Sequence, residues 1–147
     1  IIWGNHIPTM YPDFENIMAD GSPGKDLIDD MSWVENEFLP VVQQRGKAVI
    51  DSRGASSATS AAKAALDTVM ACERPTLSGD CFSAAVISDG SYDLPEVIIC
   101  GMPLMTTPDG KVEIVRDIRL SDLAKEKIKI STDELIEERS AVEDLLT

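Results

Sequence analysis

Basic residues are scarce in this sequence. It contains 13 Lys and Arg against 26 Asp and Glu, which gives a formal net charge of −13. Binding to a nucleic-acid backbone requires a basic footprint, and an anionic membrane surface attracts the same kind of patch. We therefore expect no nucleic-acid partner and no membrane partner, and we interpret the acidic residues as a solvated surface that aids solubility.

Long apolar runs are missing as well. No stretch of about eighteen apolar residues occurs, so no transmembrane helix is predicted, and there is no secretory signal. Ile1-Ile2-Trp3 opens the sequence inside an apolar run, without an initiator Met, so we expect a piece of a longer protein. The 147 residues are enough for one domain, residues 1–147, with a core of its own.

Cysteine and histidine are rare. The three cysteines, Cys72, Cys81 and Cys100, are odd in number and far apart, and none forms a CxxC pair. This favours free thiols in a reducing compartment, as in a cytoplasmic protein, over a disulfide framework or a zinc site. His6 is the only histidine, so no metal centre built from several histidines is predicted. The sequence also lacks GxGxxG, Walker A and GxSxG motifs, which carry nucleotide phosphates or a nucleophilic serine.

The order of apolar patterns predicts a short strand, then helices, then an antiparallel meander, then helices again. The expected elements are a buried strand over residues 1–6, helices over 41–53 and 58–71, strands over 82–87, 96–106 and 111–118, and a final helix from 131. Pro108-Asp109-Gly110 is a hairpin signal, and Ser121 is expected to cap a short helix. Segregated strands and helices indicate an α+β fold with helices packed on the meander, and not a doubly wound sheet.

Capping and breaking residues predict where the helices begin. Ser32 with Glu35, and Ser131 with Glu134, match the capping-box pattern, so we expect a helix to begin at each serine. Pro40 has no backbone N–H to donate, so we expect a break or a fresh helix start there.

His6 is the first candidate for chemistry. It stands at the polar end of the first expected strand, and an imidazole has a pKa near neutrality, so it can accept and return a proton at working pH. From position alone, a satisfied or surface histidine is the more common outcome.

Residues 56–60, Ser-Ser-Ala-Thr-Ser, form the second candidate, just after Gly54, which is expected to end a helix. Hydroxyls at a helix start can bind an anion together with free backbone N–H groups. Simple N-capping is the more common role for such residues.

Specific strings of the sequence are informative together. Ile1-Ile2-Trp3-Gly4-Asn5-His6, followed by Tyr11-Pro12-Asp13, resembles the stretch around the catalytic histidine of the cytosolic-type malate dehydrogenases, in the lactate/malate dehydrogenase superfamily. Further similar strings, in the family's order, lie at residues 42–46, 48–50, 56–58, 60–64, 86–92, 126–127 and 134–138. Together they run through almost the whole sequence.

The resemblance implies the C-terminal substrate and catalytic domain of an NAD-dependent malate dehydrogenase, without its N-terminal Rossmann half. Such an enzyme reversibly oxidises (S)-malate to oxaloacetate by hydride transfer between C2 of malate and C4 of the nicotinamide. His6 matches the histidine that takes the hydroxyl proton and returns it on reduction. Ser56 falls on the joint that borders the substrate, and Thr59 falls where an apolar residue of the family touches the nicotinamide.

The family's remaining machinery lies outside these residues. Its glycine-rich dinucleotide loop, the aspartate that pairs with the histidine and the arginines that clamp the substrate carboxylates all belong to the N-terminal half. We therefore expect the isolated chain neither to bind NAD tightly nor to turn over. The resemblance also implies a homodimer, formed through helices such as that expected over 58–71, and a cytoplasmic role in malate metabolism and the tricarboxylic acid cycle.

Two other interpretations stay open. The chain can be a non-catalytic isolated domain or binding module that keeps the fold. It can also belong to a related 2-hydroxy-acid dehydrogenase, because substrate choice in the superfamily is set largely by a loop in the other half. The sequence departs from the family at Ile7 and Pro8, which replace common serines, and it is a few residues short near 19–24.

Overall fold

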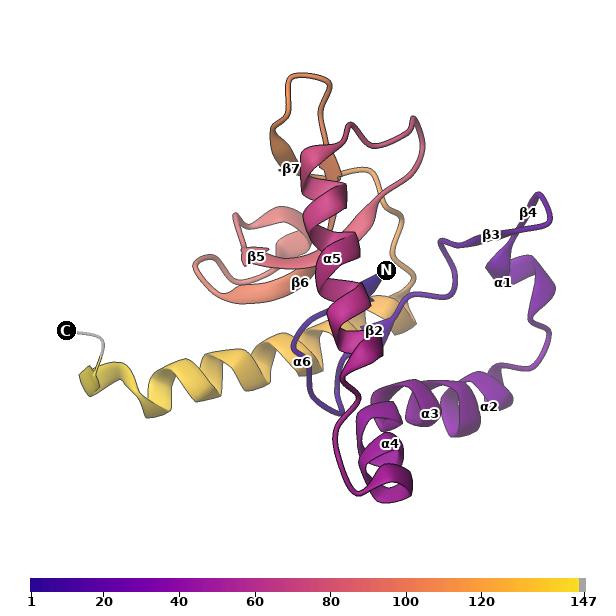
Figure 1. Cartoon of the computed structure of the whole chain (residues 1–147), viewed down its shortest axis with the longest axis vertical. Helices are drawn as coiled ribbons and strands as arrows, with labels where there is room; N and C mark the ends of the chain where they lie inside the picture. The colour runs from indigo at the N-terminus through magenta and orange to yellow at the C-terminus, as the bar shows by residue number, and fades with distance from the viewer. Residues whose placement is uncertain (146–147) are drawn as a thin grey trace.

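A three-stranded antiparallel sheet lies at the centre of the computed structural model, which describes residues 1–145 (Figure 1). Its strands are β5 (Phe82–Ile87), β6 (Ile99–Thr106) and β7 (Val112–Ile114), in the order β5-β6-β7. Helix α5 (Thr59–Glu73) crosses the sheet and contacts β5 and β6, while the long helix α6 (Asp122–Ala141) contacts β6 and then projects outward. This arrangement confirms the expected α+β class.

Two short hairpins precede the sheet. Strand β1 (Ile2–Trp3) pairs with β2 (Tyr11–Pro12), and β3 (Met18–Ala19) pairs with β4 (Ser22–Pro23), both antiparallel. The expected strand over residues 1–6 was therefore too long. It ends because Gly4 takes a positive φ of 85° and turns the chain.

The first hairpin is joined to the sheet through two glycines. Gly4 N–H donates to the Gly101 carbonyl at 3.1 Å, and Gly101 N–H donates to the Gly4 carbonyl at 2.6 Å. Strand β7 pairs with β6 only from Leu104 onward, so Gly4 occupies the edge of β6 that β7 leaves open at Gly101. The hairpin thus extends the sheet by one bridge.

Helical residues run with little interruption from Met31 to Arg53. After α1 (Gly24–Leu27), the segment consists of α2 (Met31–Trp33), a π-helical turn (Val34–Phe38), α3 (Leu39–Gln43) and α4 (Arg45–Arg53). Short 3₁₀ turns lie at Ser91–Asp93 and Glu143–Leu145.

Of the two helix starts expected in this segment, one was wrong and one is confirmed. Asp30, and not Ser32, is the N-cap of α2, because its carboxylate accepts a hydrogen bond from Trp33 N–H at 3.1 Å. Pro40 lies in the first turn of α3, directly after the π-helical turn, so the fresh helix start expected there is confirmed, although no break separates α3 from that turn. The interruption falls instead at Gln44, whose φ and ψ are −100° and 7°.

Other local predictions hold. Gly54 ends α4 in the left-handed conformation, with a φ of 68°. The turn at residues 107–111 closes with a 2.8 Å bond from Thr107 N–H to the Lys111 carbonyl. Strand β5 spans the predicted residues, whereas β6 begins at Ile99 and β7 ends at Ile114, inside the ranges expected for them.

Residues 122–141 form one helix, α6, where two helices were expected to begin at Ser121 and Ser131. Ser121 caps α6, its hydroxyl accepting from Ala124 N–H at 3.1 Å, as expected, but the helix continues for 20 residues. The capping box expected at Ser131 and Glu134 was wrong, because both residues lie inside α6. Ser131 is fully buried, so its hydroxyl serves a tertiary contact.

The core lies between the first hairpin, the sheet and α6. Its largest fully buried side chains include Trp3, Tyr11, Met102, Leu104 and Ile128. The Trp3 ring meets Tyr92 edge to face, with ring centroids 4.9 Å apart. Trp3 belongs to the strand that precedes residues 4–9, which we call the histidine loop. Core packing around Trp3 therefore fixes the position where this loop begins.

Gly4 offers a direct stability test. A Cβ at residue 4 would lie 2.2 Å from Ser131 Oγ, and its φ of 85° strains any other residue. Gly4→Ala is expected to lower the free energy of unfolding by about 2–4 kcal/mol, measured by chemical denaturation.

Gly46→Ala is the matched control. It replaces a glycine of α4 whose added Cβ would meet no heavy atom within 4 Å. This substitution should raise the free energy of unfolding by about 0.5–1 kcal/mol. Equal effects of the two substitutions would contradict the close approach of Gly4 to α6.

Candidate functional site

His6 lies on an exposed turn directly after the Gly4 bridge. It lines a hollow of about 290 Å³. The other lining residues are Ile2, Gly4, Asn5, Ser83, Ala84, Ala85, Ile99, Cys100 and Gly101. An exposed imidazole beside a small, mainly apolar hollow can exchange a proton with a bound molecule. Within residues 1–145, no hydrogen bond reaches the imidazole, so its orientation depends on the backbone that carries it.

Contacts from β6, α6 and α3 hold that backbone. Besides the Gly4 bridge to β6, Asn5 N–H donates to Ser131 Oγ of α6 at 2.9 Å. The Gln43 side-chain amide of α3 donates to the Met10 carbonyl at 2.9 Å. The histidine therefore stands on a loop that is bonded on both sides, although its side chain is exposed.

The buried carboxylate of Asp13 stabilises the hairpin of β1 and β2. Asp13 is 3% exposed and accepts hydrogen bonds from Trp3 Nε1 at 3.2 Å and from the backbone N–H groups of Glu15 and Asn16, each at 3.1 Å. The Asn16 side-chain amide donates to it as well, at 2.9 Å. Buried charges require such partners, so Asp13 ties the end of β2 to the indole of β1.

Ser56 lies on the joint between α4 and α5, Thr59 is the first residue of α5, and both are exposed. Neither residue lines the hollow beside His6. The N-cap of α5 is Ala58, with no side-chain capping bond, so the simple capping role for this serine cluster is not realised. Ser60 Oγ donates to Ser57 Oγ at 2.7 Å, whereas no hydrogen bond within residues 1–145 uses the Ser56 or Thr59 hydroxyl.

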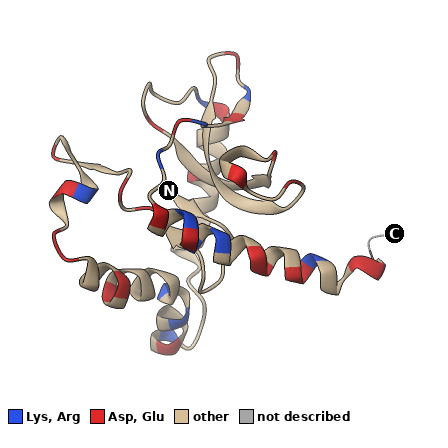
Figure 2. Cartoon of the chain, turned by 180° about the vertical axis from the view of Figure 1, so that it is seen from behind, with Lys and Arg blue, Asp and Glu red and all other residues tan. Residues whose placement is uncertain are grey.

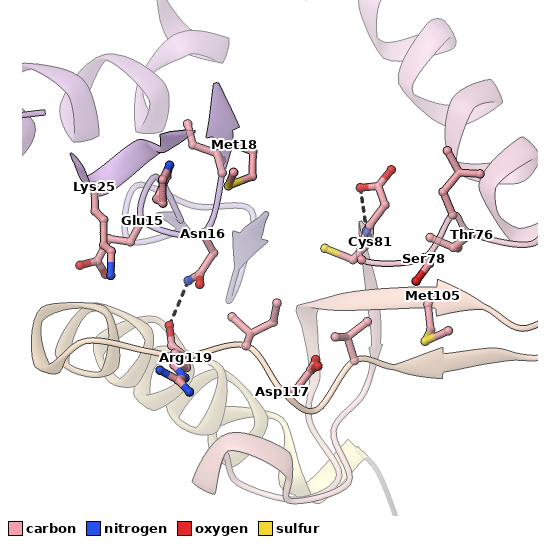
Figure 3. Close-up of a pocket in the computed structure, with 17 residues that line it drawn as sticks. Glu15, Asn16, Met18, Lys25, Thr76, Ser78, Cys81, Met105, Asp117 and Arg119 are labelled. Atoms are coloured by element: carbon pink, nitrogen blue, oxygen red, sulfur yellow. Dashed lines mark hydrogen bonds between the residues drawn. The ribbon is translucent and has the colours of Figure 1, made fainter. Parts of the chain in front are cut away.

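A larger hollow than the one beside His6 lies elsewhere. It measures about 630 Å³ and is walled by the segments 15–25, 76–81 and 115–119 (Figure 3). On one side, the Asn16 amide donates to the Arg119 carbonyl at 3.0 Å, and Cys81 lies across from it. Burial raises the pKa of the Cys81 thiol, which keeps it protonated and a poor nucleophile. No histidine lines this hollow, so its size alone does not make it a reaction site.

Basic and acidic residues are mixed along the described part of the chain. Figure 2 shows Lys and Arg interleaved with Asp and Glu along α6. Several cations are paired within helices, as in Lys47–Asp51, Lys63–Asp67 and Lys129–Asp133. Exposed pairs of this kind contribute only about 0.3–0.5 kcal/mol each.

The described residues include no group of three or more His, Cys, Asp and Glu that could hold a metal ion. In the same part of the chain, no helix is long and apolar enough to cross a membrane.

Sequence patterns missed Ser131 and Asp13 as supports of the site. Ser131 was interpreted as a helix cap, although it stands on the buried side of α6, near Ile128 and Thr132. A small polar residue on the apolar face of a long helix is the signal that could have found it. Asp13 follows two buried residues, and only the structure shows which donors surround it.

Known proteins share this domain. Residues 1–145 match the family of the lactate/malate dehydrogenase, alpha/beta C-terminal domain. The chain is 48% identical over 146 residues to a malate dehydrogenase of Magnetococcus marinus, covering 99% of this chain and 45% of that protein. It thus spans less than half the length of that relative.

Solved structures agree on the fold. The malate dehydrogenase from Naegleria fowleri superposes with a TM-score of 0.87 at 40% identity, covering 98% of this chain and 44% of that one. The Trichomonas vaginalis lactate dehydrogenase in complex with NADH and oxamate gives a TM-score of 0.87 at 24% identity, covering 99% and 45%. The second likeness shows the fold alone.

The buried thiol of Cys100 predicts that the free energy of unfolding depends on pH. It lines the hollow beside His6 and is 1% exposed, and burial raises its pKa from 9.0 to about 11. As pH rises above 9, the unfolded thiol ionises before the folded one, so stability is full below pH 9 and falls as pH approaches 11. We expect a loss on the order of 1–2 kcal/mol over this range, measured by urea denaturation.

Cys100→Ala is the control for this pH dependence. Its unfolding free energy should decline less over the same range, because the thiol no longer titrates. Buried Tyr11, whose pKa is also raised by burial, affects both proteins equally. Identical pH slopes in the two proteins would show that Cys100 does not contribute.

Proposed function

Because the chain belongs to the family of the lactate/malate dehydrogenase, alpha/beta C-terminal domain, we propose that it is the substrate-side domain of an NAD-dependent malate dehydrogenase. The observation that carries the proposal is the exposed His6 at the rim of a hollow, on a loop fixed by the sheet and α6. Identity of 48% to a malate dehydrogenase across 99% of the chain supports malate and oxaloacetate as the reactants.

In this proposal, His6 is the acid–base group. When bound, NAD would accept a hydride from C2 of malate. His6 takes the proton of the 2-hydroxyl group and returns it when oxaloacetate is reduced, because an imidazole can change protonation state near neutral pH.

Ser56, on the α4–α5 joint, and Thr59, at the start of α5, are proposed to contact the ligands. Both are exposed, and neither hydroxyl is used by a hydrogen bond within residues 1–145, so each is available to a bound molecule. We assign Ser56 to the substrate and Thr59 to the nicotinamide side.

In this proposal, the chain contacts NAD only at the nicotinamide end of the cofactor. The sequence has no glycine-rich loop to cradle the pyrophosphate. The other half of the enzyme is proposed to bind most of the cofactor and to supply the partner of the His6 imidazole. Residues 1–147 are then one domain of a longer protein, and alone they are expected to be inactive.

A homodimer and a cytoplasmic location complete the proposal. Large apolar side chains stand exposed on α4 and α5: Ile50 at 47%, Leu66 at 59% and Val69 at 59%. Apolar surface of this kind fits a protein interface. The free cysteines fit a reducing compartment, in keeping with a role in malate metabolism such as the tricarboxylic acid cycle.

Joining this chain to a nucleotide-binding half tests the enzyme. Residues 1–147 would be fused to the N-terminal part of the Magnetococcus marinus malate dehydrogenase that precedes the matched region. NADH oxidation is then measured with oxaloacetate and with pyruvate. We expect turnover of oxaloacetate by the fusion and none by the isolated chain.

His6→Asn provides the residue-level control in the fusion. Removal of the general acid and base should lower kcat by about 10²–10⁴-fold, while thermal unfolding is unchanged. A preference for pyruvate would instead assign a related 2-hydroxy-acid dehydrogenase. A well-folded fusion that binds NADH but turns over neither substrate would support a non-catalytic domain.

Ser56→Ala tests the substrate contact. Loss of one hydrogen bond to oxaloacetate should raise KM by about 5–30-fold in the fusion. Ser52→Ala, at an exposed serine of α4, is the control and should leave KM unchanged. Equal KM values for the two variants would remove Ser56 from the substrate site.

A further inference from the structure

One face of α6 bonds the chain on both sides of His6. Ser131 Oγ accepts from Asn5 N–H at 2.9 Å, just before the histidine. The Glu134 carboxylate accepts from the Thr9 hydroxyl, just after it. Residues three apart lie on the same helix face, so one turn of α6 spans the histidine loop.

The contact at Ser131 is a close one. Ser131 is fully buried in the middle of α6. Its hydroxyl oxygen accepts the hydrogen bond of the Asn5 N–H, which would otherwise need water as an acceptor. The Cβ that Gly4 lacks would lie 2.2 Å from this oxygen, so the loop backbone reaches the helix with no side chain between them. The position of α6 therefore determines where the backbone of residues 4 and 5 lies.

The Asn5 side chain passes this constraint to the histidine. Its Oδ1 accepts from His6 N–H at 2.8 Å, and its Nδ2 donates to Glu138 Oε1 of α6 at 3.5 Å. Glu138 lies four residues beyond Glu134, on the same face of the helix. Since no hydrogen bond within residues 1–145 holds the imidazole itself, these backbone contacts determine where it stands.

We propose that Ser131 and Glu134 are positioning residues for His6, which act by fixing the path of residues 4–9 against α6. This inference rests on the proposed function of His6 as the acid–base group. It assigns a role in the reaction to a helix that presents neither residue to the hollow that His6 lines. A misplaced acid–base group lowers turnover more than it weakens substrate binding, because the error is felt in the transition state.

The test uses the full-length enzyme that contains this domain and a set of matched variants. Ser131→Ala removes the buried acceptor, and Glu134→Ala removes the acceptor for Thr9. Glu134→Gln keeps a carbonyl acceptor at the same place. Glu137→Ala changes an exposed glutamate of the same helix and serves as the control.

Kinetics and hydrogen exchange are measured together. Ser131→Ala and Glu134→Ala should lower kcat with oxaloacetate by about 10–100-fold and change KM less than about threefold. Glu134→Gln should recover most of kcat, and Glu137→Ala should match the parent enzyme. Amide exchange in the peptide that covers residues 1–12 should be faster in Ser131→Ala, because the Asn5 N–H has lost its acceptor.

The outcomes separate this inference from the proposed function. An active parent enzyme whose kcat is unchanged in both alanine variants would overturn the positioning role alone. Faster exchange without loss of kcat would show that the contact is only structural and would also overturn it. A parent enzyme that does not reduce oxaloacetate would overturn the proposed function and the positioning role with it. Because Glu134 is partly exposed, its pair of variants keeps the test valid even where Ser131→Ala fails to fold.

Discussion

Two glycine backbones touch where the first strand meets the central strand of the sheet. Gly4 and Gly101 exchange hydrogen bonds, and a Cβ on Gly101 would lie 2.8 Å from the Ile2 carbonyl oxygen. On its other side, Gly4 rests against Ser131 of α6. Sheet, helix and histidine loop therefore meet at a point that no larger residue can occupy, and the position of His6 follows from this packing.

Local signals predicted much of the fold. Strand β5, the turn at residues 107–111 and the end of α4 at Gly54 follow from alternation, turn chemistry and a left-handed cap, all of which act within a few residues. The boundary expected at Ser131 failed because this residue serves a distant partner. Ser131 looks like a cap in sequence, yet its acceptor role for Asn5 becomes visible only when the ends of the chain are brought together.

The candidate site divides in the same way. The apolar residues before His6 predicted that it would follow the first strand, and it does lie beside a hollow, but β1 already ends at Trp3 and His6 stands on the turn after Gly4. The surroundings of Ser56 and Thr59 were not predictable, because this chain leaves both residues exposed, one on the α4–α5 joint and the other at the start of α5. In the proposed enzyme, the other half of the protein supplies what these two residues face.

The bond between Asn5 and Ser131 joins positions 126 residues apart. Contacts of such long range close late, because the entropy of the intervening loop must be overcome first. The histidine loop emerges early in this segment during synthesis, whereas the helix that holds it emerges last. The domain therefore completes the loop that carries His6 only after nearly all of its residues have been synthesised.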